Sequence, residues 1–526
     1  MTEALHTIIT QSLERQVSDA LSLRTIKAEV AKQYGVSMPT NASILAAYHK
    51  LLTEQRQLAD QKFLRLLQVR SVRTLSGIAP ITVLTKPYQC PGRCIYCPTE
   101  ANMPKSYIDT EPGAMRALAL RFDPYQQVTK RLQALEQNGH IPEKCELIVL
   151  GGTWTAYPND YQEWFMKRCY DGFNEDHRVD GAAGLAEAKA LNETARYRVI
   201  GCTLETRPDH IDETEVKRLR WFGATRIQIG VQSLNKHVLA LNLRDQTNEG
   251  VQHATKLLKE AGLKITYHMM QNLPGSVPAS DLQDIKTIFS DPGYQPDHIK
   301  IYPCVVVKSA PLYRHWKAGR YTTYPPAVLT NLLADIKANV PPYVRIERLV
   351  RDIPANSIID GNTITNLRQI MQQKGVQCVC IRCREPRADT TGIEQADLVV
   401  REYDSADGRE YFMSFEDPDH KKLFAFVRLR LQHRLKHWYE ELQDAAIIRE
   451  LHVYGQLVPV MESFDQLEAS PGVQHKGFGR KLMEQAEQIA RGQGFKKIAV
   501  IAGVGVRQYY EKLGYHLDQE YMIKII

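Results

Sequence analysis

The sequence predicts an α/β fold in which six β/α units precede a smaller α+β unit, with a helical region in front of both. Three observations support this prediction. Six short β-branched runs recur between about residues 78 and 310, and amphipathic helical patterns separate them. Residues 311 to about 395 look irregular, and from about residue 396 the pattern becomes that of antiparallel strands, followed by a glycine-rich turn and a helix. Apolar residues at three- and four-residue steps dominate the first 75 residues.

The length of the chain predicts several domains. A single hydrophobic core usually stops growing at roughly 250–300 residues, and this chain has 526. We expect a helical region at 1–75, the β/α array at 76–345, a linker at 346–395 and the α+β domain at 396–526. No apolar run approaches the roughly 20 residues that span a bilayer. The N-terminus lacks the apolar segment of a signal peptide, so we expect a cytoplasmic protein.

The helical N-terminal region ends in a basic stretch that contains Lys62, Arg65, Arg70 and Arg73. The chain as a whole carries a mild net charge of +7, which slightly favours a nucleic acid as partner. A solvated helix face would carry the same charges. We interpret residues 1–75 as a tRNA-binding region, in which these cations meet phosphates.

The β/α array predicts where reactive groups lie. Its six runs imply a parallel sheet, open or closed, because helices alternate with the strands; the runs span 81–85, 147–152, 198–208, 225–233, 264–270 and 298–307. In such sheets the reactive groups follow the carboxyl ends of the strands. The segments after the first three strands hold a cysteine cluster, Gly151–Thr153 and Glu205. We therefore expect these loops to converge on one face.

The cysteine cluster lies in KPYQCPGRCIYCPTE, residues 86–100, where Cys90, Cys94 and Cys97 have a C-x3-C-x2-C spacing. Three thiolates can bind three irons of a [4Fe–4S] cluster and leave the fourth open, whereas ferredoxin-type clusters fill all four positions. S-adenosylmethionine can occupy the open iron and yield a 5′-deoxyadenosyl radical after reduction. A zinc site is the alternative.

The position of this motif after the first strand of a six-fold array resembles the radical S-adenosylmethionine (SAM) superfamily, over about residues 78–345. The resemblance implies a partial (βα)6 radical-SAM barrel. It also implies that Gly151, Gly152 and Thr153 accept the amino end of the cofactor, with Glu205 and Gln228 as further cofactor residues. A tight turn or a buried polar group would explain each of these five equally well.

The C-terminal part contains QHKGFG, residues 474–479, directly before a helical pattern. Glycines let backbone N–H groups approach a pyrophosphate, and a helix N-terminus favours negative charge. With the preceding ELHVYG and the following GVRQYYEKLGY, this part resembles the Gcn5-related (GNAT) acetyltransferases, which bind acetyl-CoA, over about 396–526. The resemblance implies that cofactor contacts come from Glu450, Leu451, His452, Val453, Gln474, Gly477, Phe478, Gly479 and Arg480. Tyr509 and Tyr510 are the catalytic candidates, with helix packing as the alternative for either.

A second cysteine group, Cys378, Cys380 and Cys383, has a C-x-C-x2-C spacing. Thiolates this close in sequence favour a metal, and a structural Zn2+ takes four ligands. We predict Cys304 as the fourth ligand; a buried apolar cysteine is the alternative. Such a zinc would fix the linker at 346–395.

Both units on one chain resemble the family of the Elongator catalytic subunit in its single-chain archaeal and bacterial form. Further signatures are GGTWTAYP, LETRPD, IQIGVQS and CVCIRCRE. The resemblance implies an acyltransferase that converts the wobble uridine-34 of tRNA to 5-carboxymethyluridine. The radical would take hydrogen from the acetyl methyl of acetyl-CoA, and the carbon radical would add to uridine C5. Loss of an electron and a proton would restore the ring, and hydrolysis of the thioester would leave a carboxymethyl group. The resemblance also implies that Lys144 contacts acetyl-CoA.

Two other functions remain open at this point: a protein lysine acetyltransferase with a structural iron–sulfur domain, and a non-catalytic tRNA-binding scaffold. For the tRNA enzyme we expect base recognition in the anticodon loop, where single-stranded bases expose their edges. The sequence leaves a homodimer or accessory subunits open.

Overall fold

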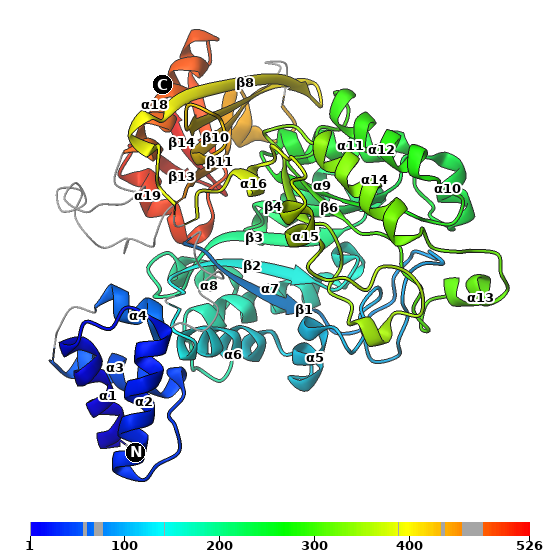
Figure 1. The fold of residues 1–526 in the computed structure, drawn as a ribbon. Helices are drawn as coiled ribbons and strands as arrows, with labels where there is room; N and C mark the ends of the chain where they lie inside the picture. Colours follow the sequence, from blue (N-terminus) through cyan, green and yellow to red (C-terminus); the bar gives the residue numbers. More distant parts are fainter. Residues whose placement is uncertain are drawn as a thin grey trace.

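The computed structural model describes residues 2–55, 60–67, 77–140, 142–387, 389–432, 437–454 and 477–526. The N-terminal region is helical, as predicted, and projects from one side of the molecule in Figure 1, where its third helix contacts the helix at Pro124–Gln137. Its helices are α1 (Thr2–Glu14), α2 (Ala20–Tyr34), α3 (Asn41–Gln55) and α4 (Gln61–Leu67). They share a small core that includes Ile8, Ile26, Ile44 and Phe63.

The first sheet contains seven parallel strands in the order β1 to β7, so each strand pairs with its neighbour in sequence. The strands are β1 (Ala79–Leu84), β2 (Lys144–Leu150), β3 (Arg198–Thr206), β4 (Arg226–Gln232), β5 (Lys264–Met269), β6 (His298–Ile301) and β7 (Arg345–Arg348). The first six coincide with the predicted runs. The seventh lies in a segment that the sequence predicted as irregular, because three of its four residues are charged.

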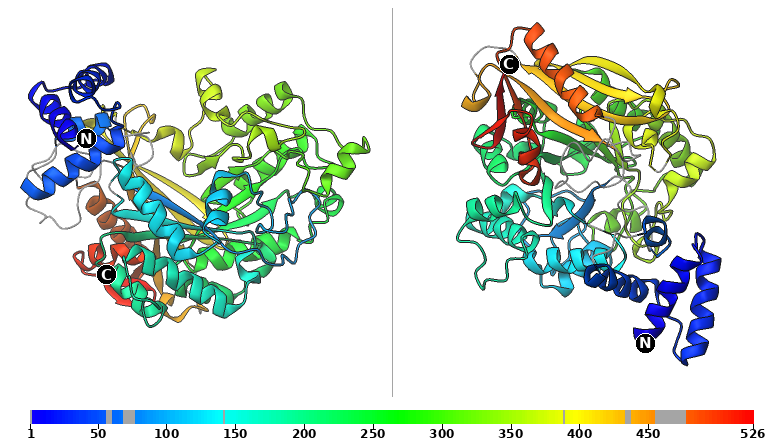
Figure 2. Two further views of the ribbon diagram at one scale, coloured as in Figure 1. Left: turned by 90° about the horizontal axis from the view of Figure 1, so that it is seen from below. Right: turned by 90° about the vertical axis from the view of Figure 1, so that its left-hand side faces the viewer.

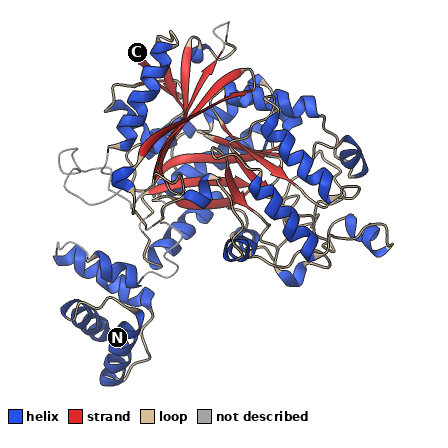
Figure 3. Ribbon diagram, turned by 45° about the horizontal axis from the view of Figure 1, so that its top comes forward, coloured by secondary structure: helices blue, strands red, loops and turns tan. Residues whose placement is uncertain are grey.

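Helices connect the strands of this sheet and pack along its outside, where Figure 3 shows them beside the strands. They are α5 (Pro112–Ala119), α6 (Pro124–Gln137), α7 (Asn159–Phe173), α8 (Leu185–Asn192), α9 (Glu213–Trp221), α10 (Lys236–Leu241), α11 (Asn248–Glu260), α12 (Pro278–Ser290), α13 (Leu312–Lys317) and α14 (Pro326–Ala338). After β7 come α15 (Leu367–Gln373) and α16 (Ile381–Arg384). None of the helices in the described ranges combines the length and apolar character that a bilayer-spanning segment requires.

The second sheet forms the C-terminal unit, with strand order β13-β14-β12-β11-β10-β9-β8. The strands are β8 (Asp397–Ser405), β9 (Gly408–Glu416), β10 (Leu423–Gln432), β11 (Ala445–Val453), β12 (Lys497–Val500), β13 (His516–Asp518) and β14 (Tyr521–Ile525). β11 and β12 are parallel and the other neighbours antiparallel. The helix α18 (Phe478–Gly492) buries Leu482, Met483 and Ala486 against this sheet, and α19 (Arg507–Glu511) follows β12.

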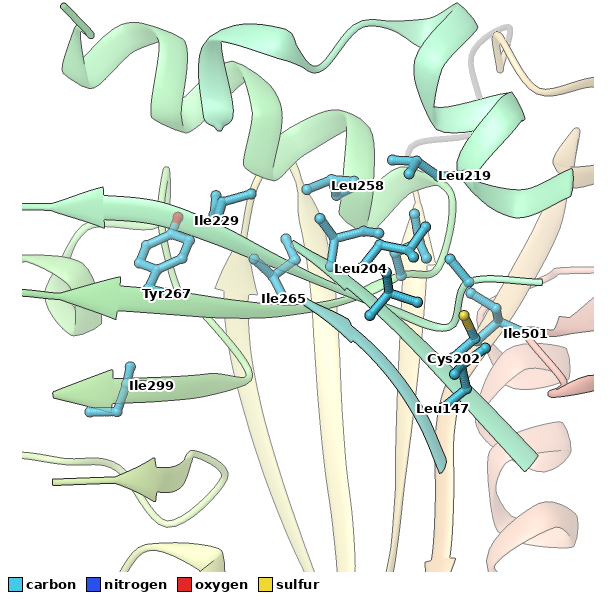
Figure 4. Packing of buried hydrophobic residues seen from close by; sticks show 14 of the residues in the cluster. Leu147, Cys202, Leu204, Leu219, Ile229, Leu258, Ile265, Tyr267, Ile299 and Ile501 are labelled. Atoms are coloured by element: carbon cyan, nitrogen blue, oxygen red, sulfur yellow. The ribbon is translucent and has the colours of Figure 1, made fainter. Parts of the chain in front are cut away.

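The two units share one hydrophobic core. Ile501 of the second unit packs in the same buried cluster as Leu147 and Cys202 of the first, as Figure 4 shows. The next residues press onto β3: a Cβ at Gly503 would collide with the Ile200 carbonyl and lie 2.9 Å from the Ile200 Cα. Because only a hydrogen fits there, glycine lets the second unit approach the barrel this closely. Figure 2 shows the two units in contact from two further directions.

A buried ionic network also joins the units. Asp297, directly before β6, accepts hydrogen bonds from Arg449 of β11 at Nη2 (2.6 Å) and Nη1 (3.0 Å). Arg449 donates in turn to Glu410 of β9 at 2.9 Å, and Arg428 of β10 lies 3.6 Å from Asp297. All four side chains are nearly inaccessible to solvent. Paired in this way, the charges stabilise one relative orientation of the two units.

Candidate active site

The cysteine loop forms one wall of a cavity of about 280 Å³ at the carboxyl ends of the barrel strands. Most of the residues predicted to bind the iron–sulfur cluster or SAM line this cavity: Cys90, Cys94, Cys97, Gly152, Thr153, Glu205 and Gln228. The converging loops that the sequence predicted therefore do meet on one face. Cys304 lines the same cavity.

The three thiols of this loop are not gathered around one point as ligands of a single ion would be. Among the described residues, only the group Cys378, Cys380 and Cys383 brings three ligand atoms within 4.8 Å of one another. The sulfurs of Cys90 and its two companions are thus spread more widely than one zinc ion requires. Burial, followed by the neighbouring Cys94, raises the pKa of Cys97 to about 12. A bound metal cluster would supply the positive charge that thiolates need there, so these residues fit a [4Fe–4S] group.

Two guanidinium groups lie against the cysteine loop. Arg244 Nη1 donates to Cys94 Sγ at 3.9 Å. Arg207 holds Asp209 through Nε (2.9 Å), while its Nη1 is buried without a hydrogen-bond partner beside Gly92. A side chain at position 92 would collide with this nitrogen. Both cations favour negative charge at this end of the barrel.

The glycine turn after β2 lies directly against Cys90. Gly151 and Gly152 have φ values of 145° and 88°, which other residues rarely adopt. A Cβ at Gly151 would collide with the Thr85 hydroxyl. Thr153 Oγ1 lies 3.5 Å from Cys90 Sγ. This geometry leaves backbone groups of the turn close to the cluster site.

Glu205 and Gln228 point into the barrel lumen. Tyr107 donates to Glu205 Oε2 at 2.9 Å, and burial raises the pKa of Glu205. Gln228 Oε1 accepts from Lys300 at 2.5 Å and lies 2.9 Å from His268 Nε2. Both side chains already form hydrogen bonds within the protein, so each is part of a polar network in the barrel interior as well as of the cavity wall.

A larger cavity, of about 850 Å³, lies between the second unit and the amino ends of the barrel strands. Most residues predicted to contact acetyl-CoA line it: Lys144, Glu450, Leu451, His452, Val453, Gly477, Gly479, Arg480 and Tyr510. The other catalytic candidate, Tyr509, lines it too. The Phe478 ring does not, because it stacks on Phe415 in the core at 4.4 Å. Gln474 lies outside the described residues.

His452 is one of several side chains of this cavity that have a buried polar atom without a hydrogen-bond partner, and it is the imidazole among them. Its Nε2 is buried without a hydrogen-bond partner, and its ring stacks on Phe426 at 5.6 Å. Burial lowers the pKa of His452 to about 4, so the imidazole is neutral at pH 7. The neighbouring Glu450 is ionised and held by Arg428 at 2.9 Å and Lys264 at 3.4 Å.

The two tyrosines differ in position. Tyr510 is nearly buried, and burial raises its pKa. The Tyr509 hydroxyl lies 3.0 Å from where a Cβ of Gly479 would be, at the start of α18. Burial raises the pKa of Tyr509 to about 12. Both hydroxyls are therefore protonated at neutral pH and can only donate or accept hydrogen bonds.

The two cavities meet inside the barrel. Ile148, Glu347 and Arg348 line both of them. Glu347 accepts from Arg226 and from His298, each at 2.8 Å. Burial by itself raises the pKa of Glu347, but Arg226, His298 and Lys300 hold it well below its usual value. Paired charges thus form part of the wall that the two cavities share.

Comparison with known proteins identifies both units. Residues 85–279 match the radical SAM superfamily, 296–375 the radical SAM C-terminal domain and 381–515 the acetyltransferase (GNAT) family. The chain is 40% identical to tRNA uridine(34) acetyltransferase of Methanocaldococcus jannaschii, over 97% of this chain and 94% of that protein. It belongs to the family of tRNA uridine(34) acetyltransferase and Elongator complex protein 3.

Other members of this family agree. Elongator complex protein 3 of Homo sapiens is 37% identical over 96% of this chain and 93% of its own. The solved structure of Elp3 from Methanocaldococcus infernus, lacking its N-terminus, is 38% identical with a TM-score of 0.73. It covers 86% of this chain, and this chain covers all of it. The two domain families imply a [4Fe–4S] cluster with SAM in one unit and acetyl-CoA in the other.

The second cysteine group of this Elongator-family protein is compact, but Cys304 does not join it. Cys378, Cys380 and Cys383 lie together beside β7, where Ile381 N donates to Val344 O at 2.9 Å. Cys304 lies beyond the carboxyl end of β6, packed with Cys94 and Tyr96, whereas the triad lies beside the amino end of β7. Among the described residues, the group of ligand atoms within 4.8 Å of one another does not include Cys304, so the predicted fourth zinc ligand was wrong.

The structure describes only some of the basic residues at the end of the N-terminal region. Lys62 is exposed on α4, the Arg65 side chain is not described, and Arg70 and Arg73 lie outside the described residues. The tRNA-binding role of residues 1–75 stays a prediction.

The sequence analysis did not predict the basic residues that the barrel contributes to the larger cavity. Arg198, Arg226, Lys264 and Arg345 stand at the amino ends of their strands and line it. In β/α barrels that end normally serves stability, so nothing in the sequence pointed to these residues. Lys144 came from the family resemblance alone.

Proposed function

We propose that this protein modifies the wobble uridine-34 of tRNA, forming 5-carboxymethyluridine from acetyl-CoA by radical SAM chemistry. The names of its relatives support the substrate, since they include tRNA uridine(34) acetyltransferase at 40% identity. The observation that carries the chemistry is the adjacency of the two cavities, which share Ile148, Glu347 and Arg348. A reaction that draws on both cofactors requires this adjacency.

The cysteine loop, with Cys90, Cys94 and Cys97, would hold the cluster, and the turn Gly151–Thr153 would receive the amino end of SAM. Together the cluster and SAM supply a 5′-deoxyadenosyl radical when bound. The chain's contribution is to enclose that site: Cys94 and Thr153 are nearly buried, and Tyr107 and Glu205 close the cavity wall. Excluding water prevents side reactions of a reactive species.

The larger cavity would hold acetyl-CoA. The start of α18, with Gly477, Gly479 and Arg480, offers backbone N–H groups and a cation to the pyrophosphate. The end of β11, at Leu451–Val453, would run beside the pantetheine arm. Neutral His452 can accept a proton through Nε2 when water attacks the thioester, and Tyr510 can orient the acetyl group by hydrogen bonding.

A protein lysine acetyltransferase is the alternative, and the position of the cavity argues against it. The barrel forms its floor through Lys144, Arg198 and Arg345. A lysine side chain entering there would meet several cations, which repel its ammonium group. The same cations suit the phosphates of CoA and RNA.

Acetyl-CoA carrying CD3 tests the proposal. The reconstituted enzyme is incubated with SAM, reductant and tRNA, and nucleosides and 5′-deoxyadenosine are analysed by mass spectrometry. We expect deuterium in 5′-deoxyadenosine and carboxymethyluridine in the tRNA, both lost in Cys94→Ala. Unlabelled 5′-deoxyadenosine at full rate alongside modified uridine would refute hydrogen removal from the acetyl methyl. Acetylated protein without modified uridine would establish the alternative.

A further inference from the structure

A cationic segment lies against the outside of the cysteine loop. It runs from the end of β6 through α13, which projects at the right-hand edge of Figure 1. Leu312 N donates to Ile95 O at 2.8 Å, and Thr99 N donates to Ser309 O at 3.0 Å. These backbone bonds tie the segment to the loop that carries the cluster cysteines. A molecule held by this segment would therefore lie at the mouth of the smaller cavity.

The segment presents four exposed cations: Lys308, Arg314, Lys317 and Arg320. None of them forms an ion pair with a residue in the described part of the chain. The carboxylate that α13 does meet, Asp360, accepts from Trp316 Nε1 at 3.0 Å and from Thr323 N at 3.4 Å. The surface keeps its positive charge, which a polyanion would neutralise.

On the other side of the cysteines, a stack of aromatic rings ends at the surface. Tyr88, two residues before Cys90, is 43% exposed and stacks on Tyr157 at 4.9 Å, with 30° between the planes. Tyr157 stacks on Tyr161 at 5.2 Å and donates to Lys86 O at 2.7 Å. Tyr157 is thereby fixed, and Tyr88 rests on a rigid support with an open side.

We propose that Tyr88 and the cationic segment, Lys308 to Arg320, form a docking rim for a single-stranded RNA loop. Phosphates meet the four cations while an unstacked base lies on the Tyr88 ring, since loops of RNA are bound by aromatic stacking and by positive grooves. The inference rests on the proposed function and extends it: the loop that carries the target uridine is held by the barrel itself.

The alternative partner is an acidic electron-donor protein, which would also bind to cations beside an iron–sulfur cluster. The aromatic stack favours RNA, because every base offers a flat face to Tyr88, whereas a protein donor needs no such platform. The experiment separates the two partners.

Binding of a fluorescent anticodon stem-loop RNA to the full-length reconstituted protein is measured over a range of salt concentrations. Arg314→Glu/Lys317→Glu should weaken binding on the order of tenfold at about 0.1 M salt and reduce the slope of log affinity against log salt by about 1.4, for two contacts. Tyr88→Ala should weaken it roughly 5- to 150-fold. Two matched controls should stay within about twofold of wild type: Tyr88→Phe, which keeps the ring on which a base stacks, and Lys286→Glu, a reversal of an exposed charge on α12 outside the rim.

Iron content and 5′-deoxyadenosine formation with dithionite or with reduced flavodoxin are measured on the same variants, to show that the cluster is intact. RNA affinity equal to wild type in the double variant and in Tyr88→Ala would overturn the docking rim and leave the proposed function standing. Loss of flavodoxin-dependent turnover with unchanged RNA affinity would overturn it in favour of a protein partner. Wild-type protein that modifies no tRNA would overturn the proposed function itself.

Discussion

Replacing Asp297 by asparagine should loosen the contact between the two units. The carboxylate accepts two hydrogen bonds from Arg449, at 2.6 and 3.0 Å, and one from Ile265 N at 2.9 Å. Burial by itself raises the pKa of Asp297, but Arg449, Lys259 and Arg428 outweigh it and hold the pKa well below the usual value. Removing one partner of a buried ion pair costs about 3–5 kcal/mol, because the other charge stays buried and unpaired.

Calorimetry measures this cost. At about 2 °C per kcal/mol, a value suited to large domains, the melting temperature should fall by about 6–10 °C. The control is Asp404→Asn: Asp404 pairs with Arg409 at 2.9 Å, but both side chains are about half exposed. Exposed pairs contribute about 0–1 kcal/mol, so the control should shift melting by at most about 2 °C.

The pH dependence gives a second check. Because the folded-state pKa of Asp297 is depressed, its contribution is fully present above the ordinary carboxyl pKa of about 3.9 and is lost as the pH falls through the folded-state value. The difference between wild type and variant should therefore be constant from pH 5 to 8. An Asp297→Asn protein that melts within about 2 °C of wild type would refute the role of the ionic network.

Three further predictions concern other features. Gly503→Ala should lower the free energy of unfolding by about 1–3 kcal/mol or more, because the added methyl group collides with the Ile200 carbonyl, and the melting temperature should fall accordingly. Gly492→Ala, where nothing lies within 4 Å of the added methyl group, should not lower the melting temperature. The pKa of His452 is about 4 when folded and near 6.5 when unfolded, so its contribution to stability should decline as pH drops from about 7 to 4, and His452→Gln should remove that part of the slope in melting temperature. Serine at all three positions of the triad Cys378, Cys380 and Cys383 should abolish bound zinc in metal analysis; stoichiometric zinc in that variant would contradict the site.

The strands that could be predicted from the sequence are those that contain a run of apolar residues. β1 to β6 bury β-branched residues on the sheet, and that pattern is local in sequence. β7 carries Arg345, Glu347 and Arg348, whose side chains turn to the cavities instead of a core, so no apolar run marks it. The helix α14 had an amphipathic pattern with Leu329, Leu332, Leu333 and Ile336 on one face, yet the sequence prediction treated its surroundings as irregular.

The site divides in the same way. The cluster cysteines and the glycine turn are short motifs, so sequence alone brings their members together. Arg198, Arg226 and Arg345 are far apart in the chain. They line one cavity with the predicted acetyl-CoA residues only because the second unit docks on the amino ends of the strands. Cys304 illustrates the opposite error. Its thiol suits a zinc ion, so the sequence analysis grouped it with Cys378, Cys380 and Cys383, but in the folded protein it lies outside their group.

The position of the larger cavity also bears on how such a chain can be inherited or engineered. Its walls come from both units, so neither half could be transplanted with this cavity complete. An excised C-terminal half would expose Arg428 and Arg449, whose carboxylate partner Asp297 stays behind. A chimera that exchanges this half between relatives must therefore carry Asp297 and the Ile200 backbone contact with it. The two halves form a single unit of recombination.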